Sequence, residues 1–172
     1  MAGEKIILRF SSPDEADRWE IINDGVMGGL SRSRMDITGN KTALFQGEVS
    51  LENNGGFASV RTLPRDFNLE GYTGLMLVFR GDGKTYRLRL RTDDTHEGIA
   101  YQSGFETVQG KWVTLYLPFD EFIPFFRGHT VEEAPPLDLS LVRRIGFMIA
   151  EGQEGPFRLE IKEIGIYGEE DS

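Results

Sequence analysis

Arginines recur at every second position between residues 86 and 91, and apolar residues fill the alternate places. In an extended strand, alternate side chains point to opposite faces, so Arg87, Arg89 and Arg91 would line one face about 7 Å apart. This separation lies inside the Debye length of about 8 Å at physiological salt, so the three charges repel one another. Either acids on adjoining strands, such as Glu106 or Glu160, neutralise the row, or the row binds a ligand.

The ligand interpretation adds three side chains that alternation also turns away from the core, namely Gln102, Trp112 and Tyr116. A sugar stacks its apolar face on an aromatic ring, and a guanidinium holds a carboxylate or phosphate through paired hydrogen bonds. If these groups share one concave sheet face, the sequence predicts a weak glycan- or anion-binding site with Arg89 at its centre.

A second candidate site is the glycine-rich segment from Asn23 to Gly29, which holds an Asn-Asp pair and three glycines in seven residues. This composition is typical of a loop with unusual backbone angles that holds oxygen atoms in place. The segment is either a tight structural loop or a ligand or partner site. In the second case, we expect Asn23, Asp24 and Met27 to make the contacts.

A third candidate lies in the long connection between Pro118 and Ser140, where phenylalanine is unusually dense. Connections of about four to six residues are the norm, so a longer ordered one usually has a reason. Its phenylalanines either cover the core or face outward as a protein contact. The contact interpretation assigns partner binding to Phe122, Phe125, Phe126 and Arg127.

The sequence offers weaker signals for catalysis and metal binding. Glu160 and Glu163 could form the acid pair of a glycosidase, but carboxylates on a strand are more often solvated or salt-bridged. The segment 52–57 could supply oxygen ligands to calcium, although a hairpin turn explains it with fewer assumptions. His96 and His129 belong to no ligand-spaced pair. We therefore expect no catalytic residue, no metal site and no cofactor.

Composition restricts the partners and the compartment. The chain has 172 residues, no cysteine and a formal net charge of −9. This charge argues against nucleic acid and anionic membranes as partners, because both attract cations. No apolar run approaches the roughly 20 residues that span a bilayer. The lack of cysteine and of an N-terminal targeting pattern predicts a cytoplasmic location.

Period-two alternation recurs along most of the chain and predicts many short strands. The expected strands are residues 6–10, 35–38, 43–51, 57–62, 75–80, 86–91, 99–107, 112–117, 142–149 and 157–167. The one helical start is at Ser12, which can cap a short helix with Pro13 at its first position that ends near Trp19.

Glycine-rich turns between the strands favour an all-β fold, a sandwich or jelly roll of two antiparallel sheets. We expect one domain over residues 1–168 and an acidic tail at residues 169–172. Alternation predicts a core formed by Phe10, Leu75, Leu77, Phe79, Leu88, Leu90, Val113, Leu115, Phe147 and Ile161.

Several of these segments resemble the complex I intermediate-associated protein family. The resemblance is carried by Trp19, by the segments 23–31 and 45–61, and by the shorter segments 81–83, 90–92, 117–119, 127–128 and 155–157. It covers nearly the whole chain and implies a galactose-binding-like jelly roll similar to carbohydrate-binding modules. It also implies a role in the assembly of respiratory NADH:ubiquinone oxidoreductase, and it carries over no catalytic residues.

Three functional hypotheses follow from the sequence. The first is a non-enzymatic assembly or scaffolding factor that binds protein partners, such as subunits of a respiratory NADH dehydrogenase or another membrane complex. The alternative is a carbohydrate- or small-anion-binding module that uses a concave face of arginines and aromatic residues. An acid–base hydrolase is the third.

Overall fold

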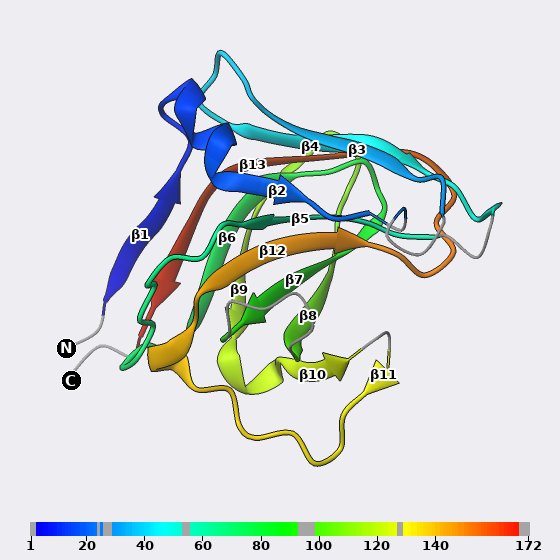
Figure 1. The fold of residues 1–172 in the computed structure, drawn as a ribbon. Helices are drawn as coiled ribbons and strands as arrows, with labels where there is room; N and C mark the ends of the chain where they lie inside the picture. The colour runs from blue at the N-terminus through cyan, green and yellow to red at the C-terminus, as the bar shows by residue number, and fades with distance from the viewer. Residues whose placement is uncertain are drawn as a thin grey trace.

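A computed structural model describes residues 3–23, 25, 29–52, 56–92, 99–126 and 129–168. Within these residues the chain forms two antiparallel β-sheets that pack face to face, with short 3₁₀ helices between strands (Figure 1). The expected all-β sandwich is therefore confirmed. The expected acidic tail lies outside the described residues.

The first sheet, called sheet A here, contains six strands within the described residues. In spatial order they are β3 (Arg32–Ile37), β4 (Ala43–Val49), β13 (Gly155–Tyr167), β6 (Gly74–Arg80) and β9 (Trp112–Pro118), while β1 (Glu4–Arg9) pairs with β13. Glu4 is the register partner of Tyr167, so the first and last strands lie side by side (Figure 1).

The second sheet, sheet B, contains seven strands within the described part of the chain. In spatial order they are β11 (His129–Thr130), β10 (Ile123–Phe126), β8 (Ala100–Glu106), β7 (Thr85–Arg91), β12 (Arg144–Ile149), β5 (Ala58–Thr62) and β2 (Trp19–Ile21). The central strands β7 and β12 pair with each other in antiparallel register. Arg91 lies opposite Arg144 at one end of this pairing, and Arg87 lies opposite Met148 at the other. Side chains from strands far apart in sequence thus share the outer side of sheet B.

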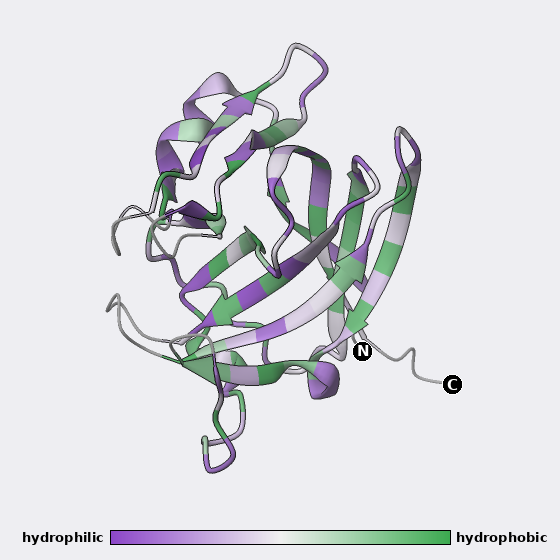
Figure 2. Ribbon diagram, turned by 90° about the vertical axis from the view of Figure 1, so that its right-hand side faces the viewer, coloured by the Kyte–Doolittle hydropathy of each residue, from purple (hydrophilic) through white to green (hydrophobic). Residues whose placement is uncertain are grey.

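The core fills the space between the two sheets, and the strands alternate between hydrophobic and hydrophilic residues (Figure 2). Every residue predicted for the core is buried except Val113 and Leu115, which are partly buried and pack against it. These two lie on β9, which is an edge strand of sheet A and has no further strand to cover it. The alternation pattern is therefore confirmed, with weaker burial at the edge.

The helix predicted after Ser12 is present as the 3₁₀ helix η1 (Pro13–Arg18). The Ser12 hydroxyl accepts a hydrogen bond from the Asp14 backbone N–H at 3.3 Å, as a helix cap does. The helix buries no residue. Without an apolar side to pack against the sheets, a longer α-helix would lack tertiary support, so a short 3₁₀ turn is sufficient here.

The long connection after β9 contains more regular structure than the sequence suggested. It holds the 3₁₀ helices η4 (Phe119–Glu121) and η5 (Leu139–Leu141), and strands β10 and β11 extend sheet B beyond β8. With four and two residues, β10 and β11 are too short to show a clear alternation pattern. The same reason explains why the three-residue strand β2 was not predicted.

Gly47 shows how closely two strands of sheet A approach. An added Cβ at this position would overlap the backbone carbonyl of Arg32 on β3. We predict that Gly47→Ala lowers the free energy of unfolding by about 1 to 3 kcal/mol, because the strands must separate to admit the methyl group. Urea unfolding followed by tryptophan fluorescence measures the change.

The matched control for this prediction is Gly39→Ala in the turn between β3 and β4. A Cβ at Gly39 would meet no heavy atom within 4 Å. This variant should stay within about 0.5 kcal/mol of the parent protein. Equal unfolding midpoints for the two variants would contradict the assigned strand pairing.

Candidate functional site

The outward side of sheet B carries five arginines, and we call this surface the arginine face. Its members are Arg61 of β5, Arg87, Arg89 and Arg91 of β7, and Arg144 of β12. Residues paired across antiparallel strands point to the same side. Gly146 pairs with both Arg61 and Arg89, and Arg144 pairs with Arg91, so the five guanidinium groups share one side. The predicted alternation of β7 is confirmed, since its other residues are buried or lie at its end.

Each arginine of β7 has at least one cross-strand neighbour without a bulky side chain. The pairs are Arg87 with Gly104, Arg89 with Gly146 and Arg91 with Ala100. An added Cβ at Gly104 would meet only the Tyr86 carbonyl at 3.8 Å, so the surface beside Arg87 is open. At Gly146 an added Cβ would lie 2.6 Å from the Val60 carbonyl oxygen, so this glycine leaves no such space.

A single carboxylate on this face serves two of the arginines. Glu20 of β2 accepts hydrogen bonds from Arg61 Nε at 2.7 Å and from Arg144 Nη1 at 2.5 Å. Burial raises the pKa of the Glu20 carboxyl, but the bonds to both arginines outweigh this effect and the pKa falls below its usual value. Glu20 is therefore ionised at neutral pH and fixes both arginines in place.

Arg87 is held by a different acid and by an aromatic ring. Its guanidinium donates to Glu151 at 2.6 Å and lies 5.6 Å from the centre of the Phe125 ring. The expectation that Glu160 neutralises the arginine row is wrong, because Glu160 lies on β13 of sheet A. The other acid named for this role, Glu106, forms no ion pair with the row, and Arg87 is paired with Glu151 instead.

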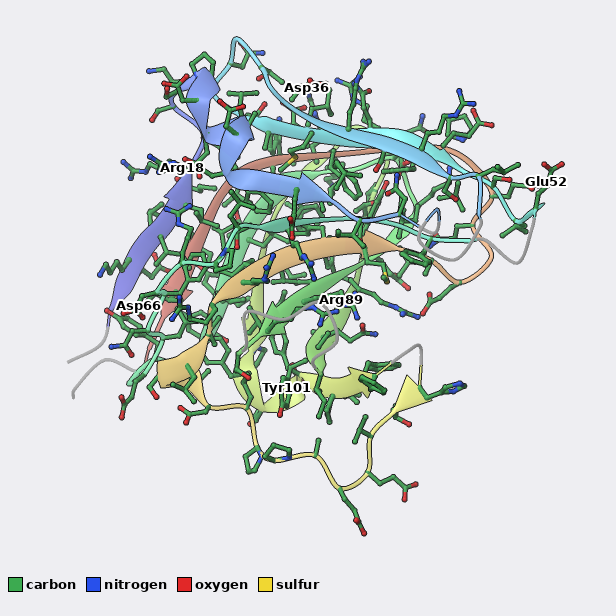
Figure 3. All side chains as sticks on the ribbon, in the orientation of Figure 1. Arg18, Asp36, Glu52, Asp66, Arg89 and Tyr101 are labelled. Carbon is green, nitrogen blue, oxygen red and sulfur yellow. The ribbon has the colours of Figure 1, made fainter. Side chains whose placement is uncertain are left out.

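Arg89 differs from these arginines, because it makes no ion pair with any residue that the structure describes. Its Nε is buried without a hydrogen-bond partner. Burial, followed by repulsion from Arg91, Arg87 and Arg61, lowers the pKa of Arg89 to about 9. The guanidinium still carries its proton at pH 7, and no described acid pairs with this positive charge. Figure 3 labels Arg89 among the side chains of sheet B.

Gln102 stands beside Arg89 as its register partner on β8. Its side chain is 5% exposed, and its Oε1 is buried without a hydrogen-bond partner. Buried polar atoms without a partner are uncommon and costly in folded proteins. An unpaired donor on Arg89 and an unpaired acceptor on Gln102 therefore mark one spot on the arginine face.

The structure does not bring Trp112 and Tyr116 to this face, and the expectation of a shared surface is wrong. Both belong to β9, which is part of sheet A. Arg80 lies 5.0 Å from the centre of the Trp112 ring, and the Tyr116 hydroxyl donates to Glu4 at 3.0 Å. The alternation along this strand correctly predicted that both rings face outward. It could not predict to which of the two sheets the strand belongs.

The described part of the glycine-rich segment has a structural role. Asn23 Oδ1 accepts from the Ser33 hydroxyl at 2.8 Å and from the Ser59 backbone N–H at 3.3 Å. These bonds connect the segment to β3 of one sheet and β5 of the other. The other residues proposed for a contact there, Asp24 and Met27, lie outside the described residues.

The phenylalanine-rich segment divides between core and surface. Phe122 is 7% exposed and packs in the core, so its assignment as a partner contact is wrong. Phe125 lies partly buried over Arg87, whereas Phe126 is 37% exposed. Arg127 lies outside the described residues.

Sequence reasoning missed Ile123, which is 51% exposed on β10. It is the register partner of Gln102 and therefore flanks the Arg89 spot on the arginine face. A lone isoleucine before a proline gives no signal of this role in the sequence. Arg61, Arg144 and Glu20 were missed for a similar reason, because only strand order brings them together.

The carboxylates considered for acid–base catalysis are engaged in separate ion pairs. Glu160 accepts from Arg80 at 2.6 Å and from the Thr42 hydroxyl at 2.7 Å, and Glu163 lies 4.0 Å from Arg9. Burial raises the pKa of Glu160, but its bonds to Thr42 and Arg80 lower it overall, which favours an ionised carboxylate over a proton donor.

The described residues contain neither a metal-ligand cluster nor a membrane-spanning helix. No group of three or more His, Asp or Glu side chains there is arranged to hold a metal ion. No helix in the same part of the chain is long and apolar enough to cross a membrane.

A second basic surface occurs on sheet A, around a groove of about 700 Å³. Its lining includes Arg34, Lys84 and Arg158. Arg34 pairs with Asp36 at 2.9 Å, and Lys84 donates to the Pro156 carbonyl at 2.7 Å. Two of its cations are therefore already engaged within the chain, which makes this groove a weaker candidate than the arginine face.

Comparison with protein families gives a match over most of the chain. The family model for Complex I intermediate-associated protein 30 (CIA30) matches residues 8–161. A relative named "Complex I intermediate-associated protein 30, mitochondrial" in Drosophila melanogaster is 26% identical over 94% of this chain and 62% of the relative. Its namesake in Mus musculus is 26% identical over 97% of this chain and 57% of the relative. The chain thus spans about six tenths of these relatives' length.

These relatives also bear on location. The matched proteins from Drosophila melanogaster, Mus musculus and Caenorhabditis elegans are named as mitochondrial or probable mitochondrial proteins. The cytoplasmic location expected from the sequence is contradicted by this finding. Lack of cysteine and of a recognisable targeting pattern was too weak a basis for that expectation.

Solved structures similar to this chain include carbohydrate-binding modules. A family 11 carbohydrate-binding module from Clostridium thermocellum, in complex with a mixed-linked tetrasaccharide, superposes with a TM-score of 0.74 at 15% identity. The alignment covers 100% of this chain and 99% of the module. A family 29 module aligns with a TM-score of 0.56 at 14% identity, over 96% of this chain and 92% of the module. At such low identity, the likeness establishes the fold alone.

Arg89 and Arg144 provide a matched pair for testing the charge balance of the arginine face. We predict that Arg89→Met raises the free energy of unfolding by about 1 to 2 kcal/mol, because it removes a buried and unpaired charge. Arg144→Met should lower it by about 1 to 3 kcal/mol, because Glu20 and the Thr62 carbonyl each lose a charged donor. Thermal and urea unfolding of both variants measure the two shifts.

The test depends on the two variants changing the free energy of unfolding in opposite directions. If Arg89→Met destabilised the protein as much as Arg144→Met does, Arg89 would have a counter-charge in solution. That outcome would contradict its assignment as the uncompensated charge of the face.

Proposed function

The chain belongs to the Complex I intermediate-associated protein 30 family, and from this premise we propose that it is a non-enzymatic assembly factor that binds protein subunits of a respiratory NADH dehydrogenase. The names of the relatives supply the class of client. The proposed activity is binding, and we assign it to the outer surface of sheet B.

The observation that carries the proposal is a surface that combines cationic and apolar side chains. The arginine face adjoins strand β10, where Ile123 is 51% exposed on the same side as Gln102. Phe126, 37% exposed at the end of β10, alternates to the opposite side and adds a second exposed apolar group to this strand. Arginine and aromatic residues are enriched at the centres of protein interfaces. In a chain whose net charge is −9, such a surface is best suited to a protein partner that offers both acidic and apolar groups.

The carbohydrate-binding alternative receives less support from the arginine face. A sugar commonly stacks its apolar face on an aromatic ring. Trp112 and Tyr116, which were expected to supply that ring, lie on sheet A. Phe125 is partly buried and already packs against Arg87. Binding of a small anion, the other half of this alternative, is still supported by the positive charge of Arg89.

We predict that the double variant Ile123→Ser, Phe126→Ser loses its client. In affinity capture from the native host, the wild-type chain should retain NADH dehydrogenase subunits identified by mass spectrometry. The double variant should retain them about 10-fold less, because truncating central apolar contacts commonly costs more than 1 kcal/mol each. Circular dichroism and thermal unfolding check that the double variant is folded.

Val108→Ser is the matched control, because Val108 is 57% exposed in the connection between β8 and β9. It removes a similar apolar group and should capture the same subunits as the wild type. The proposal fails if the wild-type chain captures no NADH dehydrogenase subunit. It also fails if the folded double variant captures as much as the control.

A further inference from the structure

We propose that the arginine face binds an extended acidic segment of a protein partner, with one carboxylate of that segment held by Arg89 beside Gln102. This inference rests on the proposed protein-binding function and names the chemistry that the partner must present. Four features of the face support it, and each concerns a different property of the surface.

The first feature is the distribution of charge. Glu20 engages Arg61 and Arg144, and Glu151 engages Arg87. No described acid engages Arg89, although it is the arginine that three others repel. A carboxylate placed there would form the strong charge-assisted bonds that a guanidinium forms with carboxylates. The site therefore selects for a negative group at one defined position.

The second feature is the pair of unsatisfied atoms at that position. Arg89 Nε offers a donor, and Gln102 Oε1 offers an acceptor, and both are buried without partners. An anion without an O–H group can satisfy only the donor. An acidic residue in a peptide can satisfy both, because its carboxylate accepts from Arg89 while a nearby backbone N–H donates to Gln102. The two atoms together favour a peptide over a simple ion.

The third feature is spacing. Alternate residues on one face of a strand are about 7 Å apart, both in β7 and in an extended peptide that lies along it. Acidic residues at alternate positions of such a peptide would therefore follow Arg87, Arg89 and Arg91. The Arg87–Glu151 pair can exchange for a peptide carboxylate, since Glu151 is 52% exposed and exposed pairs contribute little to stability.

The fourth feature is open space with an apolar border. Gly104 leaves room beside Arg87, because an added Cβ there would meet only the Tyr86 carbonyl at 3.8 Å. Ile123 borders the Arg89 spot and can pack against the apolar residues of a partner strand. A polyanion such as nucleic acid lacks these apolar groups and is repelled by the net charge of the chain. An acidic protein segment fits all four features.

The test measures direct binding of the purified chain to a defined probe. The probe is a fluorescent, capped heptapeptide with the sequence Gly-Glu-Val-Glu-Val-Glu-Gly, followed by fluorescence anisotropy at low and physiological salt. A matched peptide carries glutamine in place of each glutamate. We expect the acidic peptide to bind at least about 10-fold more tightly than the glutamine peptide, and Arg89→Met to remove that difference.

Two further variants separate a specific site from general charge attraction and from misfolding. Arg158→Met removes the same charge from an exposed position on sheet A and should change the affinity by less than about twofold. Gly104→Leu fills the space beside Arg87, where an added Cβ would meet only the Tyr86 carbonyl at 3.8 Å. This variant should fold normally and weaken peptide binding by at least about 10-fold while every arginine remains.

Three outcomes would overturn the inference. The two peptides could bind equally, Arg89→Met and Arg158→Met could weaken binding equally, or glutarate and inorganic phosphate could displace the peptide at concentrations near its own dissociation constant. The last result would identify a small anion as the ligand. If the acidic peptide does not bind but the chain still captures NADH dehydrogenase subunits, the client binds at another part of the chain. If the peptide binds but no such subunit is captured, the proposed client is rejected and the carboxylate site is retained.

Discussion

The packing of two sheets against each other is the constraint on which the other features of this structure depend. Each strand buries one side in a shared core, so the outer side of each sheet must carry every group that is not needed for packing. In β7 this division places Tyr86, Leu88 and Leu90 inside and leaves Arg89 among the arginines outside. The fold thereby presents a charged surface on a rigid central strand instead of a loop, which fixes the positions of its guanidinium groups.

The arginine face is stabilised unevenly. Glu20 bridges two arginines from neighbouring strands, and Glu151 holds a third, so these parts of the face contribute to the fold. Arg89 works against the fold, because burial and three like charges disfavour its protonated form. Natural proteins commonly retain such destabilising groups where binding requires them. A partner carboxylate would supply the counter-charge that no described residue gives to Arg89.

Local patterns in the sequence were sufficient for the strands, the side of each strand that is buried, and the Ser12 cap. They were not sufficient for contacts that depend on which strands are neighbours. Trp112 was correctly turned outward but lies on the other sheet from Arg89. Arg144 and Glu20 bond across 124 residues of chain, and no spacing rule links them. Phe122 and Ile123 are adjacent in sequence, yet one is buried and the other exposed, because β10 begins between them.

The central claim is that an acidic segment supplies the charge partner that Arg89 lacks among the described residues. Its Nε–H resonance in an NMR spectrum reports this directly, and Arg89→Lys assigns the signal by removing it. Adding the acidic heptapeptide should shift this resonance downfield, as expected for a new charge-assisted hydrogen bond, while the Nε–H of Arg158 stays in place. An unchanged Arg89 resonance under conditions where the peptide is bound would contradict the account.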